Sequence, residues 1–161
     1  MIKVFTIRRY KQSDIETIIQ HVKNFLSENR GDETYTNHFK SIDFDEARLY
    51  KKLNDNVYNV EFFLNIIEVN EEIVGGLCAT VAQPIYSNQT IAYDQLLYTT
   101  PHYNVVRAVT ELINSYVEWS KRRGVFECRL CSSTGFKQDG FSILMKRAKF
   151  QQFEIGFAKR F

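Results

Sequence analysis

Hydrophobic residues recur along this chain with two periods, and each stretch of constant period predicts one element of secondary structure. Apolar and polar side chains alternate over residues 2–9, IKVFTIRR, which predicts a strand. The following apolar residues are spaced by three and four positions, which predicts a helix from Ser13 to about Leu26, with Ser13 and Glu16 as a capping box. The members of this helical stripe are Ile15, Ile18, Ile19, Val22 and Phe25.

The middle of the chain carries a second helix pattern and three strand patterns. The helix is expected from Asp43, which can cap it together with Glu46, to Leu53. Polar residues at 70–72 separate the first two strands and fit a hairpin turn, so an antiparallel meander is expected. The strand patterns cover residues 57–69, 73–83 and 90–99.

The last third of the chain alternates between helix and strand. A long helix pattern at 104–123 ends at Gly124, a residue suited to a helix C-terminus, and a strand follows at 125–133. A shorter helix is expected at 137–148, and residues 150–161 close the chain as one strand or a hairpin. The strands on either side of the long helix form a βαβ unit with it, so we expect them to be parallel.

Length and composition fit one globular domain over residues 1–161, since 44% of the residues are apolar and 25% are charged. The net charge of +2 is too small to indicate nucleic acid or a membrane surface as a partner. The sequence shows neither an apolar signal core nor a run of 18 apolar residues. We therefore expect a cytoplasmic protein that does not span a membrane.

Two of the three cysteines, Cys128 and Cys131, form a CxxC motif without the second pair that a zinc site needs. Residues three positions apart in a strand point to opposite faces, so we expect no metal site and no redox role here. An odd number of cysteines without a disulfide framework favours a reducing compartment.

The stretch TTPHYNVVRAV, residues 99–109, joins a predicted strand to the long predicted helix. Such a turn can hold a phosphate, because a helix N-terminus offers unpaired backbone N–H groups and a partial positive charge. Glycines usually let the backbone approach the phosphate closely, and this turn contains none.

The element order, the strand, turn and helix in DQLLYTTPHYNVVRAVTELINSYVEWSKRRG and the SSTG at 132–135 together resemble the GNAT family of N-acetyltransferases, most closely its phage-encoded branch. The resemblance implies an α/β (α+β) GNAT fold, with a mixed, mostly antiparallel sheet of six to seven strands and about four helices. It also implies acetyl-CoA as the cofactor and an amine as the acetyl acceptor, with a homodimer as a possible assembly.

The resemblance assigns the cofactor to one strand and the turn after it. In the family the pantetheine arm pairs with the backbone at positions corresponding to Leu97, Tyr98 and Thr99, and the pyrophosphate lies on the turn. The turn positions here are Asn104, Val105, Val106, Arg107, Ala108 and Val109.

The turn departs from the family's P-x-x-R-G-x-G pattern. Asn104 stands in place of the arginine, and Val105 and Val106 stand in place of glycines. Arg107 and Val109 occupy further positions that usually hold small side chains. A β-branched residue at positive φ is strained by roughly 1–3 kcal/mol, so we expect a different loop shape. The helix N–H groups remain, and Arg107 could reach a phosphate.

Catalysis in this family needs a route for the amine proton and a proton donor for the leaving thiolate. Asp94 is the candidate base, with an exposed strand carboxylate as the alternative. The family's donor tyrosine corresponds to Met145, which cannot donate a proton. Tyr93, Tyr98, Tyr103 and His102 lie near the turn, either as substitutes or as packing and exposed residues.

Two functional hypotheses follow. The chain is either an acetyltransferase that uses acetyl-CoA and an amine acceptor, or a GNAT-fold protein that has lost catalysis. In the second case it would bind a phage or host protein, in the host cytoplasm or as a virion component. A nucleic-acid-binding module is a weaker third hypothesis, because no base-reading motif is visible.

Overall fold

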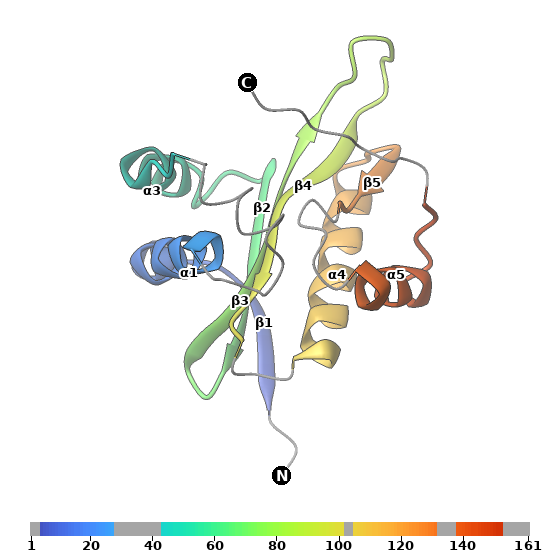
Figure 1. Ribbon diagram of the computed structural model, residues 1–161. Coiled ribbons are helices and arrows are strands. Elements are labelled where there is room, and N and C mark those ends of the chain that lie inside the picture. Colours follow the sequence, from blue (N-terminus) through green and yellow to red (C-terminus); the bar gives the residue numbers. More distant parts are fainter. Residues whose placement is uncertain (1–3, 28–42, 102–104, 132–137, 153–161) are drawn as a thin grey trace.

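A computed structural model describes residues 4–27, 43–101, 105–131 and 138–152 (Figure 1). In chain order the elements are β1 Phe5–Arg9, a 3-10 turn Gln12–Asp14, α1 Ile15–Ser27, α3 Glu46–Asp55, β2 Phe62–Val69, β3 Glu72–Ala82, β4 Ile91–Thr99, α4 Val106–Arg122, β5 Glu127–Arg129 and α5 Gln138–Arg147.

The described strands form one five-stranded sheet in the order β1-β2-β3-β4-β5. The first four strands are antiparallel neighbours, and β5 is parallel to β4, as the βαβ pattern predicts. Asn70 and Glu71 both have positive φ, 52° and 66°, and form a two-residue turn between β2 and β3, which confirms the predicted hairpin.

The strand count differs from the expected six to seven. Residues 150–152 of the expected last strand are not in a strand, and the rest of that segment lies outside the described residues. The mixed, mostly antiparallel sheet and the four α-helices of the described ranges agree with the expected architecture.

Helices cover both faces of the sheet: α1 and α3 lie on one side, α4 and α5 on the other (Figure 1). The two faces hold two separate apolar clusters, because successive strand residues point to opposite faces. On β2, Phe63 and Ile67 pack toward α4, whereas Leu64 and Ile66 pack toward α1.

The two N-terminal helices begin differently from the prediction. A capping box of Lys11 and Asp14, rather than the pair Ser13 and Glu16, precedes the first one, and in it the Asp14 carboxylate accepts a hydrogen bond from the Lys11 N–H at 2.7 Å. Asp45, rather than Asp43, caps α3 by accepting from the Arg48 N–H at 2.9 Å. The long helix ends as expected, since Gly124 follows it with φ of 66°.

Candidate active site

The edge of β4 that faces β5 is only partly paired. β5 pairs with β4 at Ile91, Ala92 and Tyr93, and the chain then leaves the sheet. Within the described ranges, no strand pairs with this edge of β4 at residues 95–99. The second half of β4 therefore presents backbone groups that an extended ligand could pair with.

The register of β3 and β4 decides which backbone groups face this open edge. The Thr100 N–H donates to the Val74 carbonyl at 2.8 Å, and hydrogen-bonded pairs recur at every second residue of an antiparallel ladder. The backbone of Tyr98 consequently faces its partner Gly76 on β3. The N–H and C=O groups of Leu97 and Thr99 face the open edge.

A β-bulge lies just before this edge. Leu96 is opposite Cys78 and Asp94 is opposite Ala79, so Gln95 is an extra residue on β4. A bulge redirects the side chains that follow it. As a result Leu97 packs toward α4 and Leu96 packs toward α1, while Asp94 precedes the bulge.

Asp94 lies where β4 and β5 separate. Its Oδ1 accepts a hydrogen bond from the backbone N–H of Cys131, just after β5, at 2.9 Å. The side chain is half-buried, so it is not the exposed strand carboxylate of the alternative interpretation. Burial raises the pKa of Asp94 to about 6, against the opposing effect of the Cys131 N–H. A carboxylate with this pKa is ionised at neutral pH and suited to accept a proton.

The start of α4 lies directly after the open edge. Val105 is the N-cap residue, with φ of −114° and ψ of 22°, and no side chain caps the helix. The valine is therefore not strained, and the turn has a backbone shape that needs no glycine at this position. The first helical hydrogen bond joins the Val109 N–H to the Val105 carbonyl at 2.8 Å. The N–H groups of residues 106–108 precede it and have no intrahelical acceptor.

Side chains around this helix start separate into two groups. Val106 is 58% exposed and Arg107 is also exposed, whereas Ala108 and Val109 are buried. Val105 is half-buried and packs against the core cluster. The first turn of α4 contains no acidic residue. Asn104 lies outside the described residues.

The structure offers few proton donors beside β4. Met145 is 9% exposed and packs in the cluster on the α4 side, as a core residue does. The Tyr116 hydroxyl donates to the Arg129 carbonyl at 3.0 Å, which gives it a structural partner. Tyr93 is half-buried. His102 and Tyr103 lie outside the described residues.

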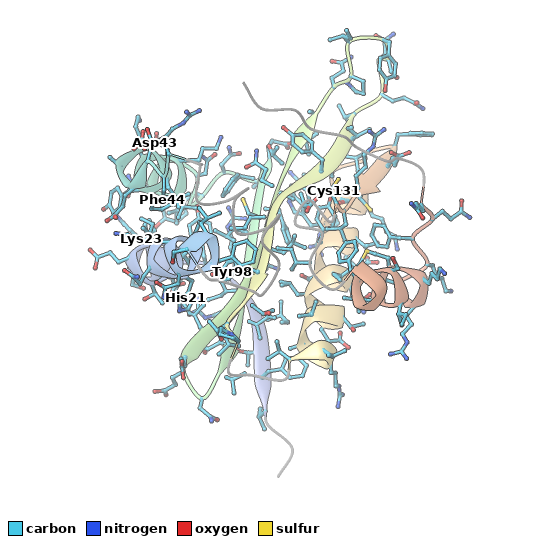
Figure 2. All side chains as sticks on the ribbon, in the orientation of Figure 1. His21, Lys23, Asp43, Phe44, Tyr98 and Cys131 are labelled. Atoms are coloured by element: carbon cyan, nitrogen blue, oxygen red, sulfur yellow. The ribbon has the colours of Figure 1, made fainter. Side chains whose placement is uncertain are left out.

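Tyr98 differs from these residues. Its side chain points to the α1 face of the sheet, where its ring meets the ring of His21 edge-on (Figure 2). Sequence reasoning missed His21, because a single histidine on the polar side of a helical stripe carries no signal of its tertiary neighbours. It also missed the Asp94–Cys131 contact, because the two residues are 37 positions apart in sequence and no local pattern links them.

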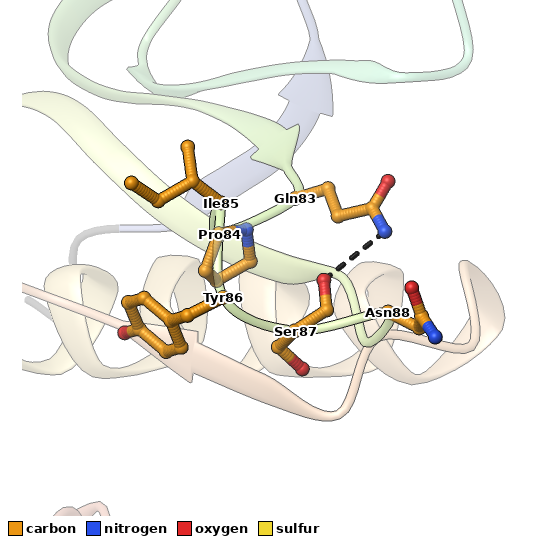
Figure 3. A pocket seen from close by; sticks show the side chains of 6 residues that line it. All are labelled: Gln83, Pro84, Ile85, Tyr86, Ser87 and Asn88. Carbon is orange, nitrogen blue, oxygen red and sulfur yellow. Dashed lines mark hydrogen bonds between the residues drawn. The ribbon is translucent and has the colours of Figure 1, made fainter.

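A hollow of about 460 Å³ lies at the other end of β4, in the turn between β3 and β4 (Figure 3). Residues of this one turn line it, and the Gln83 side chain donates to the Ser87 carbonyl at 3.1 Å across it. It contains none of the residues discussed above, and we assign it no role.

No protein-family model and no curated protein sequence matches this chain. Solved structures do match over nearly the whole length. An aminoglycoside acetyltransferase from an uncultured soil metagenomic sample, in complex with sisomicin, is 21% identical, with a TM-score of 0.67 over 98% of this chain and 96% of that chain. Glucosamine-6-phosphate N-acetyltransferase from Arabidopsis thaliana is 12% identical, with a TM-score of 0.71 and 99% of each chain covered.

A third similar structure is a predicted acetyltransferase from Clostridium acetobutylicum, solved with acetyl-CoA. It is 16% identical, with a TM-score of 0.68 over 98% of this chain and 96% of that chain. The chain has the GNAT acetyltransferase fold. The GNAT fold expected from the sequence is thus confirmed. At these identities the similarity establishes the fold alone, and any reaction has to be inferred from the residues of the site.

Two further observations concern partners. Among the described helices, none has the length and apolar character needed to cross a bilayer. The described residues also contain no cluster of three or more His, Cys, Asp or Glu side chains arranged to hold a metal ion.

Proposed function

We propose that this protein binds acetyl-CoA and transfers its acetyl group to an amine. One observation carries the proposal: the open edge of β4 at Leu97 and Thr99 leads directly to the uncapped N-terminus of α4. The first element offers backbone pairing and the second offers N–H donors for an anion. The structural similarity to an acetyltransferase solved with acetyl-CoA supports the same ligand.

Two parts of the cofactor, the pantetheine arm and the pyrophosphate, would have counterparts in the site. The pantetheine amides would pair with the backbone of Leu97 and Thr99, and the pyrophosphate would lie at the N–H groups of residues 106–108. Arg107 would add a cation beside these N–H groups.

Bound acetyl-CoA would supply an activated acetyl thioester. The amine nitrogen forms the new bond to the carbonyl carbon, the carbon–sulfur bond breaks, and Asp94 takes the proton from the nitrogen. Water would protonate the departing thiolate, because Met145 has no proton to donate. Among the described residues, Asp94 would then be the one side chain with a direct part in the chemistry.

Calorimetric titration with acetyl-CoA, and with desulfo-CoA as a non-reacting probe, tests the binding step. Val106→Asp places a carboxylate at the positive end of α4, which favours the helix by about 0.3–1 kcal/mol but repels a pyrophosphate. We expect Val106→Asp to weaken binding at least tenfold without loss of thermal stability, and Val106→Asn to bind like the wild type.

Arg107→Ala should weaken binding several-fold, whereas Arg122→Ala, at the other end of the same helix, should not. Absence of heat and of thermal stabilisation at millimolar acetyl-CoA would overturn the proposal. Binding that is equal in Val106→Asp and Val106→Asn would show that the pyrophosphate lies elsewhere.

A second candidate is a GNAT-fold protein that binds a phage or host protein without catalysis. The buried Met145 at the position of the family's donor tyrosine favours it. A stoichiometric complex with such a protein, unchanged by Asp94→Asn, would support this candidate, and acetyl-CoA-dependent turnover would exclude it. Phage origin and homodimer formation also stay predictions, the latter testable by light scattering.

A further inference from the structure

Large apolar side chains that are exposed to solvent gather at one end of the sheet. At this end β2 begins with Phe62, opposite Thr80 of β3. β4 and β5 also begin here, at the parallel pair Ile91 and Glu127. Among the described residues nine large apolar side chains are exposed, and five of them adjoin these strand ends: Tyr58 and Val60 before β2, Ile85 and Tyr86 after β3, and Phe126 before β5.

The connection between β3 and β4, residues 83–90, forms an arm that projects beyond the helices (Figure 1). The Gln83 side chain donates to the Ser87 carbonyl on one side of the turn, and Ile85 and Tyr86 lie on the other side (Figure 3). The Ile85 side chain is fully exposed. The arm therefore presents two large apolar side chains to solvent.

The arm and the adjoining parts of β3 and β4 carry no charge. From Ile73 to Tyr93 the sequence contains no Asp, Glu, Lys, Arg or His, although 25% of the chain is charged. Exposed strands usually carry charged side chains, which prevent other chains from pairing with them. Within the described ranges, no strand pairs with the β2-facing edge of β3 at Val81 and Ala82. An uncharged, apolar projection of this kind is typical of a surface that another chain covers.

The surface beside the arm is held in place by hydrogen bonds. We call Tyr58, Val60 and Phe126 the flank. Arg9 donates to four carbonyls between residues 56 and 62, and Trp119 Nε1 donates to the Val60 carbonyl at 3.0 Å. The flank tyrosine thus stands on a fixed backbone. Rigid aromatic side chains are common anchors of protein interfaces, because little entropy is lost when they are ordered.

The charges around the flank favour a second copy of this chain as the occupant. Glu61, next to Val60, pairs with Arg123 at 3.3 Å, and Glu127, next to Phe126, pairs with Arg129. In a two-fold symmetric dimer the same surface of both copies takes part, so a surface of one sign would repel itself. An uncharged arm and a flank whose acidic neighbours are already paired avoid this repulsion.

The exposed aromatic area is also sufficient for a large part of a dimer interface. Tyr58, Tyr86 and Phe126 are 91%, 81% and 67% exposed. An aromatic side chain can bury about 150–250 Å², so these three would contribute roughly 350–600 Å² per copy. A stable interface buries about 800 Å² per copy, and the other apolar side chains of the arm and the flank would add to the aromatic area.

We infer that this end of the sheet is the interface of a two-fold symmetric dimer, in which the arm of each copy packs on the flank of the other. The family resemblance predicts a homodimer without naming an interface, and the arm and flank supply one. The inference does not rest on acetyl transfer. The open edge of β4 at Leu97 and Thr99 lies at the opposite end of the strand and stays accessible in such a dimer.

Sedimentation velocity of the full chain over a concentration series tests the interface. We expect a wild-type dimer that dissociates on dilution. Ile85→Glu and Val60→Glu should each raise the dissociation constant by about 30-fold or more, because each leaves a charge unpaired in the interface. Both side chains are exposed in the single chain, so the melting temperature of the monomer should be unchanged.

Val4→Glu and Ile143→Glu are the matched controls, since both replace exposed apolar side chains outside the arm and the flank. Val4 precedes β1, whose Phe5 pairs with the last residue of β2, and therefore lies at the other end of the sheet. Both controls should dimerise like the wild type. Loss of the dimer in a control, together with its survival in Ile85→Glu, would place the interface elsewhere and overturn the inference.

A charge pair tests whether the arm meets the flank. Ile85→Lys should weaken the dimer as Ile85→Glu does, and adding Val60→Glu to Ile85→Lys should restore it at least in part, because each lysine then faces a glutamate of the other copy. Ile85→Lys combined with Val4→Glu should not recover. Failure of the first combination to recover overturns the packing of arm on flank.

Three further outcomes overturn the inference. They are a wild type that stays monomeric up to its solubility limit, even if Ile85 then proves to bind another protein or a lipid vesicle, a dimer that survives Ile85→Glu, and oligomers that grow beyond two copies. Acetyl-CoA titration of Ile85→Glu should match that of the wild type, so the interface and the proposed function can fail independently.

Discussion

The backbone N–H of Cys131 donates to the Asp94 carboxylate at 2.9 Å across 37 residues of sequence. This bond lies just beyond Tyr93 and Arg129, the last paired residues of β4 and β5. The carboxylate thus joins the two strands at the point where the ladder ends. The side chain that we propose as the base thus also connects β4 to the residues after β5 at the point where the two strands separate. Its catalytic and structural roles therefore need separate tests.

Asp94→Asn should remove the base and keep the contact, because the amide oxygen still accepts from the Cys131 N–H. We expect kcat to fall by about 10²–10⁴. In the wild type, kcat/KM should rise with pH through an apparent pKa near 6, following the pKa of Asp94. The pH–rate profile of both proteins checks this. An Asn variant with wild-type kcat and the same profile would make Asp94 purely structural.

The stability of the Asp94 variants should depend on pH in a defined direction. The folded-state pKa of about 6 lies above the ordinary 3.8, so the folded state holds the proton more tightly. The contribution of Asp94 to the free energy of unfolding of the wild type is fully present below pH 3.8 and is lost as pH rises through about 6. Asp94→Asn does not titrate, so this loss does not occur in the variant. Its free energy of unfolding should exceed that of the wild type by an amount that grows toward neutral pH, to on the order of 2–3 kcal/mol. Asp94→Ala, which also lacks the acceptor, should gain less.

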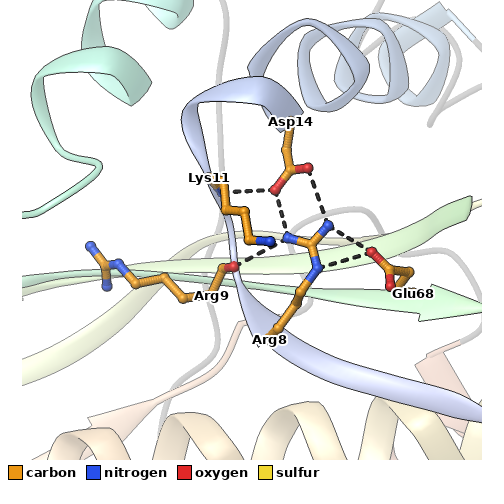
Figure 4. A network of polar contacts seen from close by, with 5 residues as sticks. All are labelled: Arg8, Arg9, Lys11, Asp14 and Glu68. Atoms are coloured by element: carbon orange, nitrogen blue, oxygen red, sulfur yellow. Dashed lines mark hydrogen bonds and ion pairs between the residues drawn. The ribbon is translucent and has the colours of Figure 1, made fainter. Parts of the chain in front are cut away.

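The Arg8 guanidinium joins two carboxylates, Asp14 and Glu68, and so ties β1 to the start of α1 and to β2 (Figure 4). Burial alone would raise the pKa of Asp14, but the hydrogen bonds from Arg8 and from the Lys11 N–H outweigh it and lower the pKa below 3.8. Asp14→Asn should cost about 1.5–3 kcal/mol at pH 7, the usual contribution of a hydrogen bond to a charged group.

The Asp14 contribution should depend on pH in the opposite sense to that of Asp94. A depressed folded-state pKa gives stability that is present above 3.8 and is lost as pH falls through the lower folded value. The difference between wild type and Asp14→Asn should therefore shrink in acid, as measured by urea unfolding at several pH values. A difference that is constant down to pH 2 would show that the Asp14 charge does not stabilise the fold.

Arg9 holds the connection between α3 and β2. Its guanidinium donates to the carbonyls of Asn56, Val57, Asn59 and Phe62 at 2.9–3.1 Å. A lysine ammonium is a single point charge with three donors, so it cannot reach four carbonyls at once. We expect Arg9→Lys to cost about 1.5–3 kcal/mol in urea unfolding and to speed hydrogen exchange at the Phe62 amide.

Arg123→Lys is the matched control for Arg9→Lys. Arg123 makes one ion pair with Glu61 at 3.3 Å, and the pair is near the surface, so its replacement should change stability by less than about 1 kcal/mol. Equal effects of the two substitutions would mean that the carbonyl contacts of Arg9 contribute little.

The sequence predicted those features of the fold that depend on local patterns of hydrophobic and polar residues. Periodicity located every described helix and strand, and the βαβ order predicted the parallel pair of β4 and β5, because these features follow from residues near one another in the chain. The helix starts were assigned to residues neighbouring Asp14 and Asp45, since Ser, Asp and Glu at adjacent positions all fit a cap. Asp14 is selected by its contacts with Arg8 and the Lys11 N–H, and Asp45 by its hydrogen bond from the Arg48 N–H. The bulge at Gln95 and the pairing of Tyr98 with His21 depend on tertiary register, which no local pattern records.

Gly75 and Gly76, neighbours on β3, should respond differently to replacement by alanine. At Gly75 an added Cβ would lie 2.8 Å from the backbone oxygen of Tyr98, which cannot move without disturbing the ladder. At Gly76 the nearest atom is Cε1 of the Tyr98 ring, at 3.0 Å. Overpacking typically costs about 1–3 kcal/mol, and we expect Gly75→Ala at the upper end and Gly76→Ala at the lower end.

A double-mutant cycle with Tyr98→Leu separates the two glycines. A leucine lacks the ring atoms that Gly76→Ala would press against, so the two substitutions should couple, and the double variant should be more stable than the sum of the single effects by about 0.5–3 kcal/mol. Gly75→Ala should show no such coupling, because its obstacle is backbone. Absence of coupling between Gly76→Ala and Tyr98→Leu, measured by urea unfolding, would show that the Tyr98 ring does not lie across Gly76, and coupling at Gly75 would show that its obstacle is not backbone alone.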